Sequence, residues 1–284
     1  MKLYVMNDTS VQLHAGCRAV MEILYKLLED HEILCIHRVN DLEVDEASFM
    51  ECDAVVVNGE DSMHSARPNA NFILDTMVIA QKMGKKTAIV NAVWQNAISY
   101  KDKYGAMLKK LDLFTVRETA SRENARLCGG DPQVFPDLCI DTQLSTLPPK
   151  YEGELVIGGA GATVHHSKFF AALGEHRLSL NVGKPLAACV AALRGAQGYV
   201  TGQHHGVYTA VLANVPFVAV PSNTHKIQGL IQWSGFPIRV NQTEAGIKSS
   251  IQGLDHSRSI FSEFNVWLME QPRLTKQIIN SSLT

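Results

Sequence analysis

The sequence has no excess of charge of either sign. Its 284 residues include 26 Lys and Arg against 28 Asp and Glu, a formal net charge of −2 at pH 7. A protein without a basic excess has no general attraction for nucleic acid or anionic lipid. We therefore expect no nucleic-acid partner, and any anionic ligand must be held by a local site.

Long apolar runs and several well-known sequence motifs are also missing. No run approaches the 18 apolar residues of a membrane span, and Met1–Val5 leads straight into a strand-like segment instead of a signal peptide, which predicts a cytoplasmic protein. The motifs G-x-S-x-G and G-x-x-x-x-G-K-[ST] do not occur, which argues against a serine hydrolase and a P-loop enzyme. A composition of 46% hydrophobic and 19% charged residues is typical of a globular protein.

The six cysteines form no recognisable metal motif. They lie in apolar stretches without a C-x-x-C pair, and the histidines show no H-E-x-x-H spacing. Such a pattern predicts reduced, mostly buried thiols and no metal site.

Strand-like and helix-like segments alternate along the chain. The strands, such as 53–57, 113–116 and 198–201, are continuous apolar runs between amphipathic helices, as in a parallel sheet covered on both faces. Ser145–Gly153 breaks the pattern with two prolines and reads as a linker. We predict an α/β fold of two Rossmann-like domains, 1–147 and 148–284, facing across a cleft, with the final helix around 260–268 packing back across the junction.

Ligands of open α/β sheets bind beyond the carboxyl ends of the strands, so loops after strands are the candidate sites. The first such loop is 58–64, where glycine allows close backbone approach and the polar side chains could bind sugar hydroxyls. A glycine-rich turn, 158–163, is followed by two histidines, but it lacks the third glycine of a dinucleotide fingerprint. The candidate ligand-binding residues of these two loops are Asn58, Gly59, Glu60, His64, Gly161, His165 and His166.

Arg117 follows another strand, where its planar guanidinium suits a carboxylate or a phosphate. The alternative is a structural arginine paired with Glu118 or another nearby acid. Ser121 is expected to cap the following helix.

The richest loop is 198–212, which places His204 and His205 at the start of a helix. Free backbone N–H groups and the positive dipole end favour an anion there, and they disfavour protonated imidazole. His205 is the better candidate for proton transfer, whereas His204 is better explained by a hydrogen bond to a neighbouring loop. The candidate anion-binding residues are Arg117, Gly202, Gln203, His204, Gly206 and Lys226.

The order of these motifs resembles the polysaccharide pyruvyl transferase family. The resemblance runs from about Asp8 to Trp233 and rests on D-A-V-V-V-N-G-E at 53–60, V-N-A-V-W-Q at 90–95, L-F-T-V-R-E at 113–118, P-D at 136–137 and G-Q-H-H-G at 202–206. Members look like GT-B glycosyltransferases, and several transfer a pyruvyl group from phosphoenolpyruvate to two sugar hydroxyls as a ketal. The family arginine that binds the donor corresponds to Arg117, and the family histidine corresponds to His205.

The resemblance implies a cytoplasmic transferase of bacterial-type surface polysaccharide biosynthesis. It would act on an anionic donor and a saccharide acceptor, with phosphoenolpyruvate as co-substrate and no cofactor. The candidate residues of loops 58–64 and 158–166 would then bind the acceptor, and Arg117, Gly202, Gln203, His204, Gly206 and Lys226 would bind the donor. Membrane association would be at most peripheral, through a lipid-linked acceptor, and homo-oligomerisation is left open. Many members have arginine where this chain has Gln203. Two alternatives therefore remain: a glycosyltransferase using a phosphate-activated or nucleotide sugar, and a non-catalytic glycan-binding relative.

Overall fold

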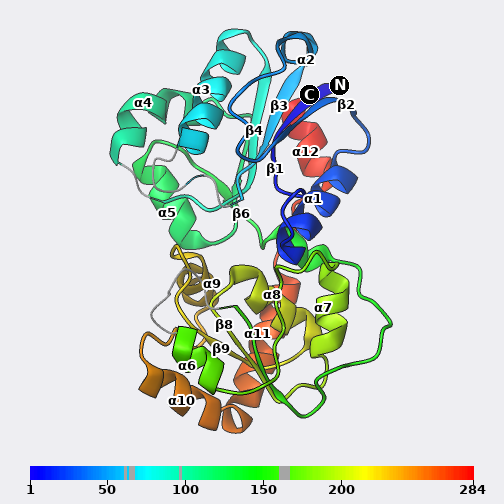
Figure 1. The fold of residues 1–284 in the computed structure, drawn as a ribbon. Coiled ribbons are helices and arrows are strands. Elements are labelled where there is room, and N and C mark those ends of the chain that lie inside the picture. The colour runs from blue at the N-terminus through cyan, green and yellow to red at the C-terminus, as the bar shows by residue number, and fades with distance from the viewer. Residues whose placement is uncertain (61–62, 64–67, 96–97, 160–166) are drawn as a thin grey trace. The chain divides into compact units, whose positions relative to one another are not determined.

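The computed structural model describes residues 1–60, 63, 68–95, 98–159 and 167–284 (Figure 1). The chain forms two compact units. The first contains 1–11, 20–138 and 272–284, and the second contains 12–19 and 139–271. The predicted candidates His64, Gly161, His165 and His166 lie outside the described residues.

The first unit is built on a parallel sheet of six strands. These are β1 (Lys2–Asp8), β2 (Glu32–Arg38), β3 (Ala54–Asn58), β4 (Lys86–Ala92), β5 (Leu113–Val116) and β6 (Gln133–Val134). Their order is β2-β1-β3-β4-β5-β6, and each neighbouring pair is parallel. From β1 the chain thus adds β2 at one edge of the sheet, and from β3 it adds the remaining strands toward the other edge. Loops that diverge in this way leave a crevice at the carboxyl ends of β1 and β3.

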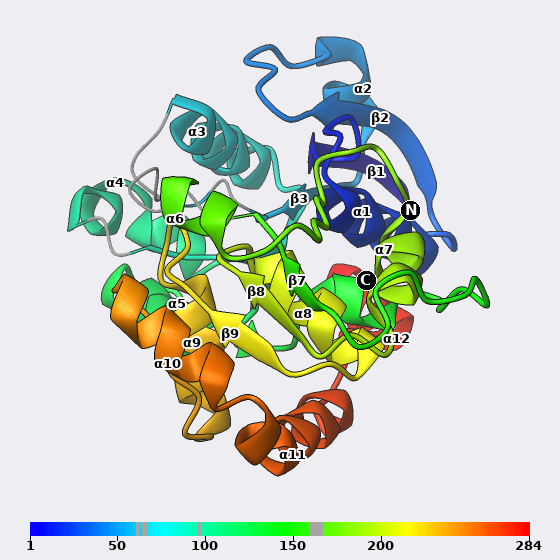
Figure 2. The same ribbon diagram turned by 60° about the horizontal axis from the view of Figure 1, so that its bottom comes forward.

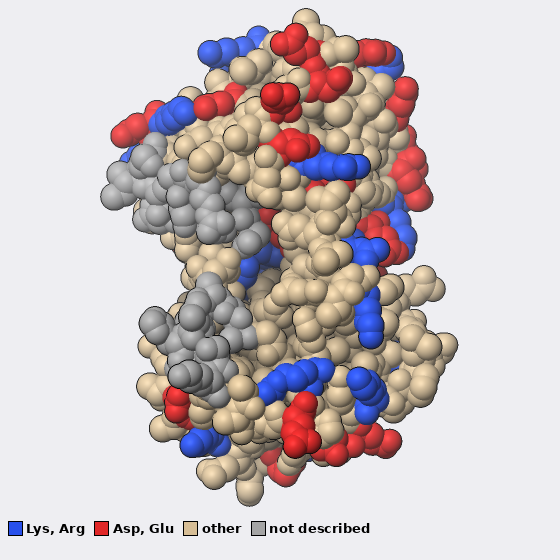
Figure 3. Space-filling view, in the orientation of Figure 1, with Lys and Arg blue, Asp and Glu red and all other residues tan. Residues whose placement is uncertain are grey.

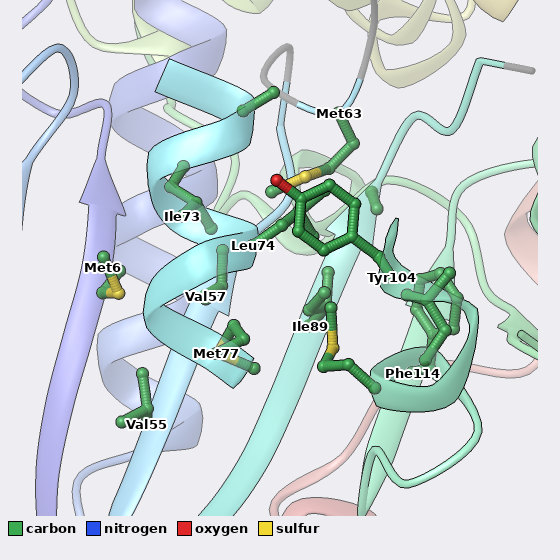
Figure 4. Packing of buried hydrophobic residues seen from close by; sticks show 14 of the residues in the cluster. Met6, Val55, Val57, Met63, Ile73, Leu74, Met77, Ile89, Tyr104 and Phe114 are labelled. Carbon is green, nitrogen blue, oxygen red and sulfur yellow. The ribbon is translucent and has the colours of Figure 1, made fainter. Parts of the chain in front are cut away.

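Helices cover both faces of this sheet. They are α1 (Ala15–Leu27), α2 (Glu46–Glu51), α3 (Pro68–Lys82), α4 (Ile98–Leu108), α5 (Thr119–Leu127) and α12 (Lys276–Leu283). Fully buried Ile73, Leu74 and Met77 of α3 pack on Val57 and Ile89 of the strands (Figure 4). α12 contacts β4 and β5, so the C-terminal helix belongs to the core of the first unit.

The second unit has a shorter parallel sheet with the order β7-β8-β9 (Figure 2). Its strands are β7 (Leu155–Ile157), β8 (Gly198–Thr201) and β9 (Phe217–Ala219). Parallel bridges from Ile157 to Arg177 and from Ala219 to Val240 extend it at both edges. If these five segments are numbered by their place in the sequence, their order across the sheet is 2-1-3-4-5, the same as that of the first five strands in the first unit. The corresponding switch point lies at the carboxyl ends of β7 and β8.

The helices of this unit are α6 (Ser167–Ala172), α7 (Leu186–Leu193), α8 (His204–Ala213), α9 (Lys226–Ser234), α10 (Glu244–Gln252) and α11 (Arg258–Glu270), with single 3-10 turns η1 (Leu138–Asp141), at the boundary of the units, and η3 (Asp255–Ser257). Phe261 and Phe264 of α11 pack edge-on against Phe217 of β9. The apolar stretch around 260–268 is therefore part of the second unit's core, and the segment that returns to the first unit begins at Pro272.

The surface agrees with the balanced charge of the sequence. Acidic and basic side chains are interspersed over the face shown in Figure 3. Five of the six cysteines are buried, as the sequence predicts. Within the described part of the chain, no helix has both the length and the apolar character needed to cross a membrane.

Candidate functional site

A buried polar network lies at the carboxyl ends of β1 and β3 in the first unit. Asn7, the penultimate residue of β1, donates from Nδ2 to the carbonyl oxygen of Asn58 at 2.6 Å, and Thr9 donates from Oγ1 to Glu60 Oε2 at 2.8 Å. Asn58 Oδ1 in turn accepts the backbone N–H of Glu60 at 3.2 Å. All four residues are at most 2% exposed. The network fixes a carboxylate at the β1/β3 switch point, which is where the strand order predicts a ligand.

Gly59 makes this geometry possible. A Cβ at this position would lie 2.4 Å from the Cβ of Ala92, the last residue of β4. The backbone N–H of Gly59 donates to the carbonyl oxygen of Val90 at 2.7 Å. Only glycine lets the chain turn so close to the neighbouring strand and bring Glu60 into place.

The carboxyl end of β5 carries a buried ion pair between Arg117 and Asp137. The pairing of Val116 with Val134 places the chain after β6 beside the chain after β5, so the two side chains meet. They are 1% and 0% exposed. The sequence offered a structural ion pair as the alternative interpretation of Arg117, and the partner that the structure shows is Asp137. Donor binding by Arg117 remains a prediction.

Asn91 holds the acidic partner of this pair in place. It adopts a left-handed backbone conformation (φ 57°) at the end of β4, and its Oδ1 accepts the backbone N–H of Leu138 at 3.1 Å. Asparagine tolerates this conformation better than most residues. Asn91 therefore positions the segment that carries Asp137.

Glu118 and Ser121 organise the start of α5. Glu118 is the N-cap, and its Oε2 accepts the backbone N–H of Ser121 at 2.9 Å. Ser121 Oγ accepts the backbone N–H of Trp94 at 2.9 Å. The sequence predicted Ser121 as the cap; the structure shows that the capping side chain is Glu118 and that Ser121 joins α5 to the loop after β4.

In the second unit, His204 and His205 are the first two residues of α8, directly after the loop that follows β8. Both are buried, at 2% and 6% exposure. The ring of His204 lies 5.0 Å from that of Tyr208, whereas the ring of His205 lies 5.1 Å from that of His14. His204 thus faces its own helix, while His205 faces the segment before α1.

The turn around these histidines is tightly packed. A Cβ on Gly206 would lie 2.2 Å from Thr201 Oγ1, and a Cβ on Gly159 would lie 2.7 Å from Gln203 Cδ. Gly202 donates its N–H to the carbonyl oxygen of Gly159 at 3.0 Å, which joins the loops after β7 and β8. Lys226, the first residue of α9, is 9% exposed. Gln203 and His205 therefore sit at the switch point of the second sheet.

A buried tyrosine supports this turn from β8. Tyr199 in β8 is fully buried and donates its hydroxyl to the carbonyl oxygen of Leu178 at 3.2 Å. Burial raises the pKa of Tyr199 well above its usual value, so this phenol stays neutral. It supports the loop sterically, because a Cβ on Gly158 would lie 2.4 Å from its oxygen.

Sequence analysis missed the contribution of the loop after β1. His14 and Cys17 belong to the second unit and group with His205, so that one nitrogen or sulfur atom from each lies within 4.8 Å of the others. The available signal was the H-x-G-C motif at 14–17, which places a histidine and a thiol at the first turn of a helix. No single segment shows the spacing of a metal motif, because this group combines two segments that are far apart in the sequence.

Comparison with known proteins identifies the fold. A UDP-N-acetylglucosamine 2-epimerase from Rickettsia bellii is 9% identical with a TM-score of 0.56, covering 99% of this chain and 96% of that chain. The S. aureus MnaA–UDP complex is 12% identical with a TM-score of 0.57, covering 93% and 90%. An alpha-glucosyltransferase in complex with UDP and DNA is 9% identical with a TM-score of 0.52, covering 99% and 98%. These structures share the GT-B fold of glycosyltransferases and sugar epimerases.

Comparison of the sequence itself gives the family. Curated proteins yield no match. The family model described as polysaccharide pyruvyl transferase matches residues 13–224, a range that includes Asn58, Arg117, Asp137 and His205. Since this match spans most of the sequence, the chain belongs to the polysaccharide pyruvyl transferase family.

Proposed function

We propose that the protein transfers a pyruvyl group from phosphoenolpyruvate to two hydroxyl groups of a sugar, forming a ketal during the biosynthesis of a surface polysaccharide. Family and fold support a transferase or a related sugar-modifying enzyme. The observation that carries the finer proposal is His205, a buried imidazole in the first turn of α8, at the position that corresponds to the family histidine.

The proposed reaction needs a proton donor first. His205 gives a proton to the methylene carbon of phosphoenolpyruvate, and the neighbouring carbon becomes electrophilic. The oxygen of one sugar hydroxyl attacks that carbon, and its proton passes to the imidazole of His205. The C–O bond to phosphate then breaks, and the second hydroxyl attacks the same carbon and gives its proton to the departing phosphate, which closes the ketal. A positioned acid of this kind contributes about 10²–10⁴-fold.

Each unit carries groups suited to the proposed substrates. In the first unit, the guanidinium of Arg117 suits the carboxylate or phosphate of the donor. In the second unit, the N-terminus of α8 favours an anion. Glu60, held by Thr9 and Asn58, offers a fixed carboxylate that can accept hydrogen bonds from sugar hydroxyls. We assign Glu60 to the acceptor.

A second candidate function is transfer of a sugar from a nucleotide donor. Two of the similar GT-B structures contain UDP, and Gln203 stands where many family members have an anion-binding arginine. In this case the N-terminus of α8 would neutralise the leaving diphosphate.

Donor binding distinguishes the two functions. The purified protein is heated with phosphoenolpyruvate, with a panel of nucleotide sugars, or with UDP, and the melting temperature is measured. A ligand at 100 times its Kd stabilises the fold by about 2.7 kcal/mol. Stabilisation by phosphoenolpyruvate alone is expected; stabilisation by UDP compounds alone would replace the pyruvyl proposal with the sugar-transfer one.

A further inference from the structure

One cluster of side chains has the composition of a metal site, which the proposed transfer does not require. His14 precedes α1, Cys17 lies in the first turn of α1, and His205 lies in the first turn of α8. One ligand atom from each lies within 4.8 Å of the other two, and all three residues belong to the second unit. Cys17 and His205 are buried at 8% and 6% exposure.

Backbone contacts hold the segment that carries His14 and Cys17. Ala15 donates its N–H to the carbonyl oxygen of Leu180 at 2.7 Å, and the carbonyl oxygen of Leu13 accepts the N–H of Gly183 at 2.8 Å. These bonds fix the start of α1 on the loop that precedes α7. The backbone is thus anchored on both sides of His14, three residues before Cys17.

Gly16 brings the segment onto the imidazole of His205. A Cβ on Gly16 would lie 2.1 Å from His205 Cγ, so any larger residue would separate α1 from α8. The rings of His14 and His205 are consequently 5.1 Å apart and inclined by 53°. Imidazoles at this spacing and angle can converge on one point between them.

The ligand chemistry is that of a borderline-soft metal. Zinc and the neighbouring transition metals bind thiolate sulfur and imidazole nitrogen, whereas magnesium and calcium prefer oxygen ligands. Cysteine binds such metals through its thiolate sulfur. We propose that His14, Cys17 and His205 form a three-ligand site for a divalent transition-metal ion of the zinc class, with the fourth position open.

Binding would change one hydrogen bond that the structure shows. Gly16 donates its N–H to His14 Nδ1 at 3.1 Å. A metal at Nδ1 takes the accepting lone pair, and a metal at Nε2 moves the ring proton to Nδ1. In either case Gly16 loses its acceptor, so its amide resonance reports on metal binding.

Occupation of the site would also affect the proposed transfer. A metal bound to His205 occupies the imidazole that we assign as proton donor, so the metal-loaded protein is expected to lose activity. This consequence rests on the proposed function, whereas metal binding itself does not.

Cobalt titration tests the site directly. The full chain is stripped with a chelator, Co²⁺ is added, and absorption is recorded; Zn²⁺ is then added in competition. We expect one ion per chain, a thiolate-to-cobalt band in the near ultraviolet, and loss of the band on adding Zn²⁺. Cys17→Ser should abolish that band, and His14→Gln or His205→Gln should weaken binding by at least about ten-fold.

Matched controls come from the same unit. Cys189→Ser replaces a buried thiol in α7, and His176→Gln replaces an imidazole that is 44% exposed; both lie outside the cluster and should bind Co²⁺ as the parent does. X-ray absorption of the cobalt-loaded parent should find one sulfur ligand, which tests the site even if a variant fails to fold.

The proposal is overturned if the parent shows no thiolate band, or if Cys17→Ser and His14→Gln bind as tightly as the parent. Cobalt binding by a protein that transfers no pyruvyl group would support the metal site and count against the proposed function alone.

Discussion

The buried ion pair of the first unit allows a sharp prediction about stability. Arg117 and Asp137 are 1% and 0% exposed, so Asp137→Asn leaves a guanidinium charge where water cannot reach it. Breaking a buried pair by removing one charge costs about 3–5 kcal/mol. Because asparagine keeps the size of the side chain and one acceptor oxygen, we expect a loss near the lower end, about 3 kcal/mol.

Tryptophan fluorescence can report on the first unit alone. Trp94 is fully buried there against Phe114, while Trp233 and Trp267 pack on each other in the second unit. In a Trp233→Phe, Trp267→Phe background, urea unfolding followed by fluorescence measures the free energy of unfolding around Trp94.

An exposed ion pair provides the control. Asp131 pairs with Arg126 at 2.8 Å, and their side chains are 78% and 46% exposed. Asp131→Asn should cost less than about 1 kcal/mol, as is usual for exposed pairs. A loss below about 1 kcal/mol for Asp137→Asn as well would refute the reasoning that burial makes this pair critical.

A double replacement separates stability from function. Replacing a buried pair by apolar residues of similar size is often neutral or stabilising. The Arg117→Met, Asp137→Leu protein should therefore be more stable than Asp137→Asn, yet inactive if Arg117 binds the donor. Full activity in this double variant would remove Arg117 from the proposed site.

Three further predictions concern other residues. His205→Ala should lower turnover with phosphoenolpyruvate about 10²–10⁴-fold while circular dichroism shows an intact fold; near-normal turnover would exclude it as proton donor. Gly16→Ala should lower the free energy of unfolding by about 1–3 kcal/mol, because the new Cβ would collide with His205. Gly174→Ala is the control: a Cβ there has nothing within 4 Å, so the free energy of unfolding should change by less than about 0.5 kcal/mol. Equal effects of the two changes in urea unfolding would contradict the close approach of Gly16 to His205. Burial lowers the pKa of His37 below its usual 6.5, so below that pH the unfolded chain binds a proton that the folded protein does not, and urea midpoints should fall more from about pH 7.5 to about 5.5 in the parent than in His37→Gln. Parallel pH curves for the two proteins would contradict this.

The strands were predictable because each is an apolar run bounded by loop residues. The predicted strand 198–201 matches β8, and 53–57 differs from β3 by one residue at each end. Short helices escaped prediction: α2 has six residues and α12 has eight, too few turns to show an apolar period. Their positions depend on the caps Asp45 and Thr275 and on packing against the sheet.

Candidate site residues could be selected from the sequence where one segment carries the signal and not where two segments meet. His205 and Arg117 were selected because each follows an apolar strand. The pairing of Arg117 with Asp137 depends on the register of β5 and β6, and the approach of His14 and Cys17 to His205 depends on Gly16. Such contacts between distant segments follow from tertiary packing, which periodicity along one chain does not report.

The return of the last thirteen residues to the first unit has a practical consequence for any attempt to express that unit by itself. A fragment ending at Leu138 would lack α12, and the apolar surface of β4 and β5 that buried Ile279 and Leu283 help to cover would meet water. A fragment that represents the first unit should therefore combine residues from both ends of the sequence, joined by a linker. A simple stop codon after the first sheet should give insoluble material.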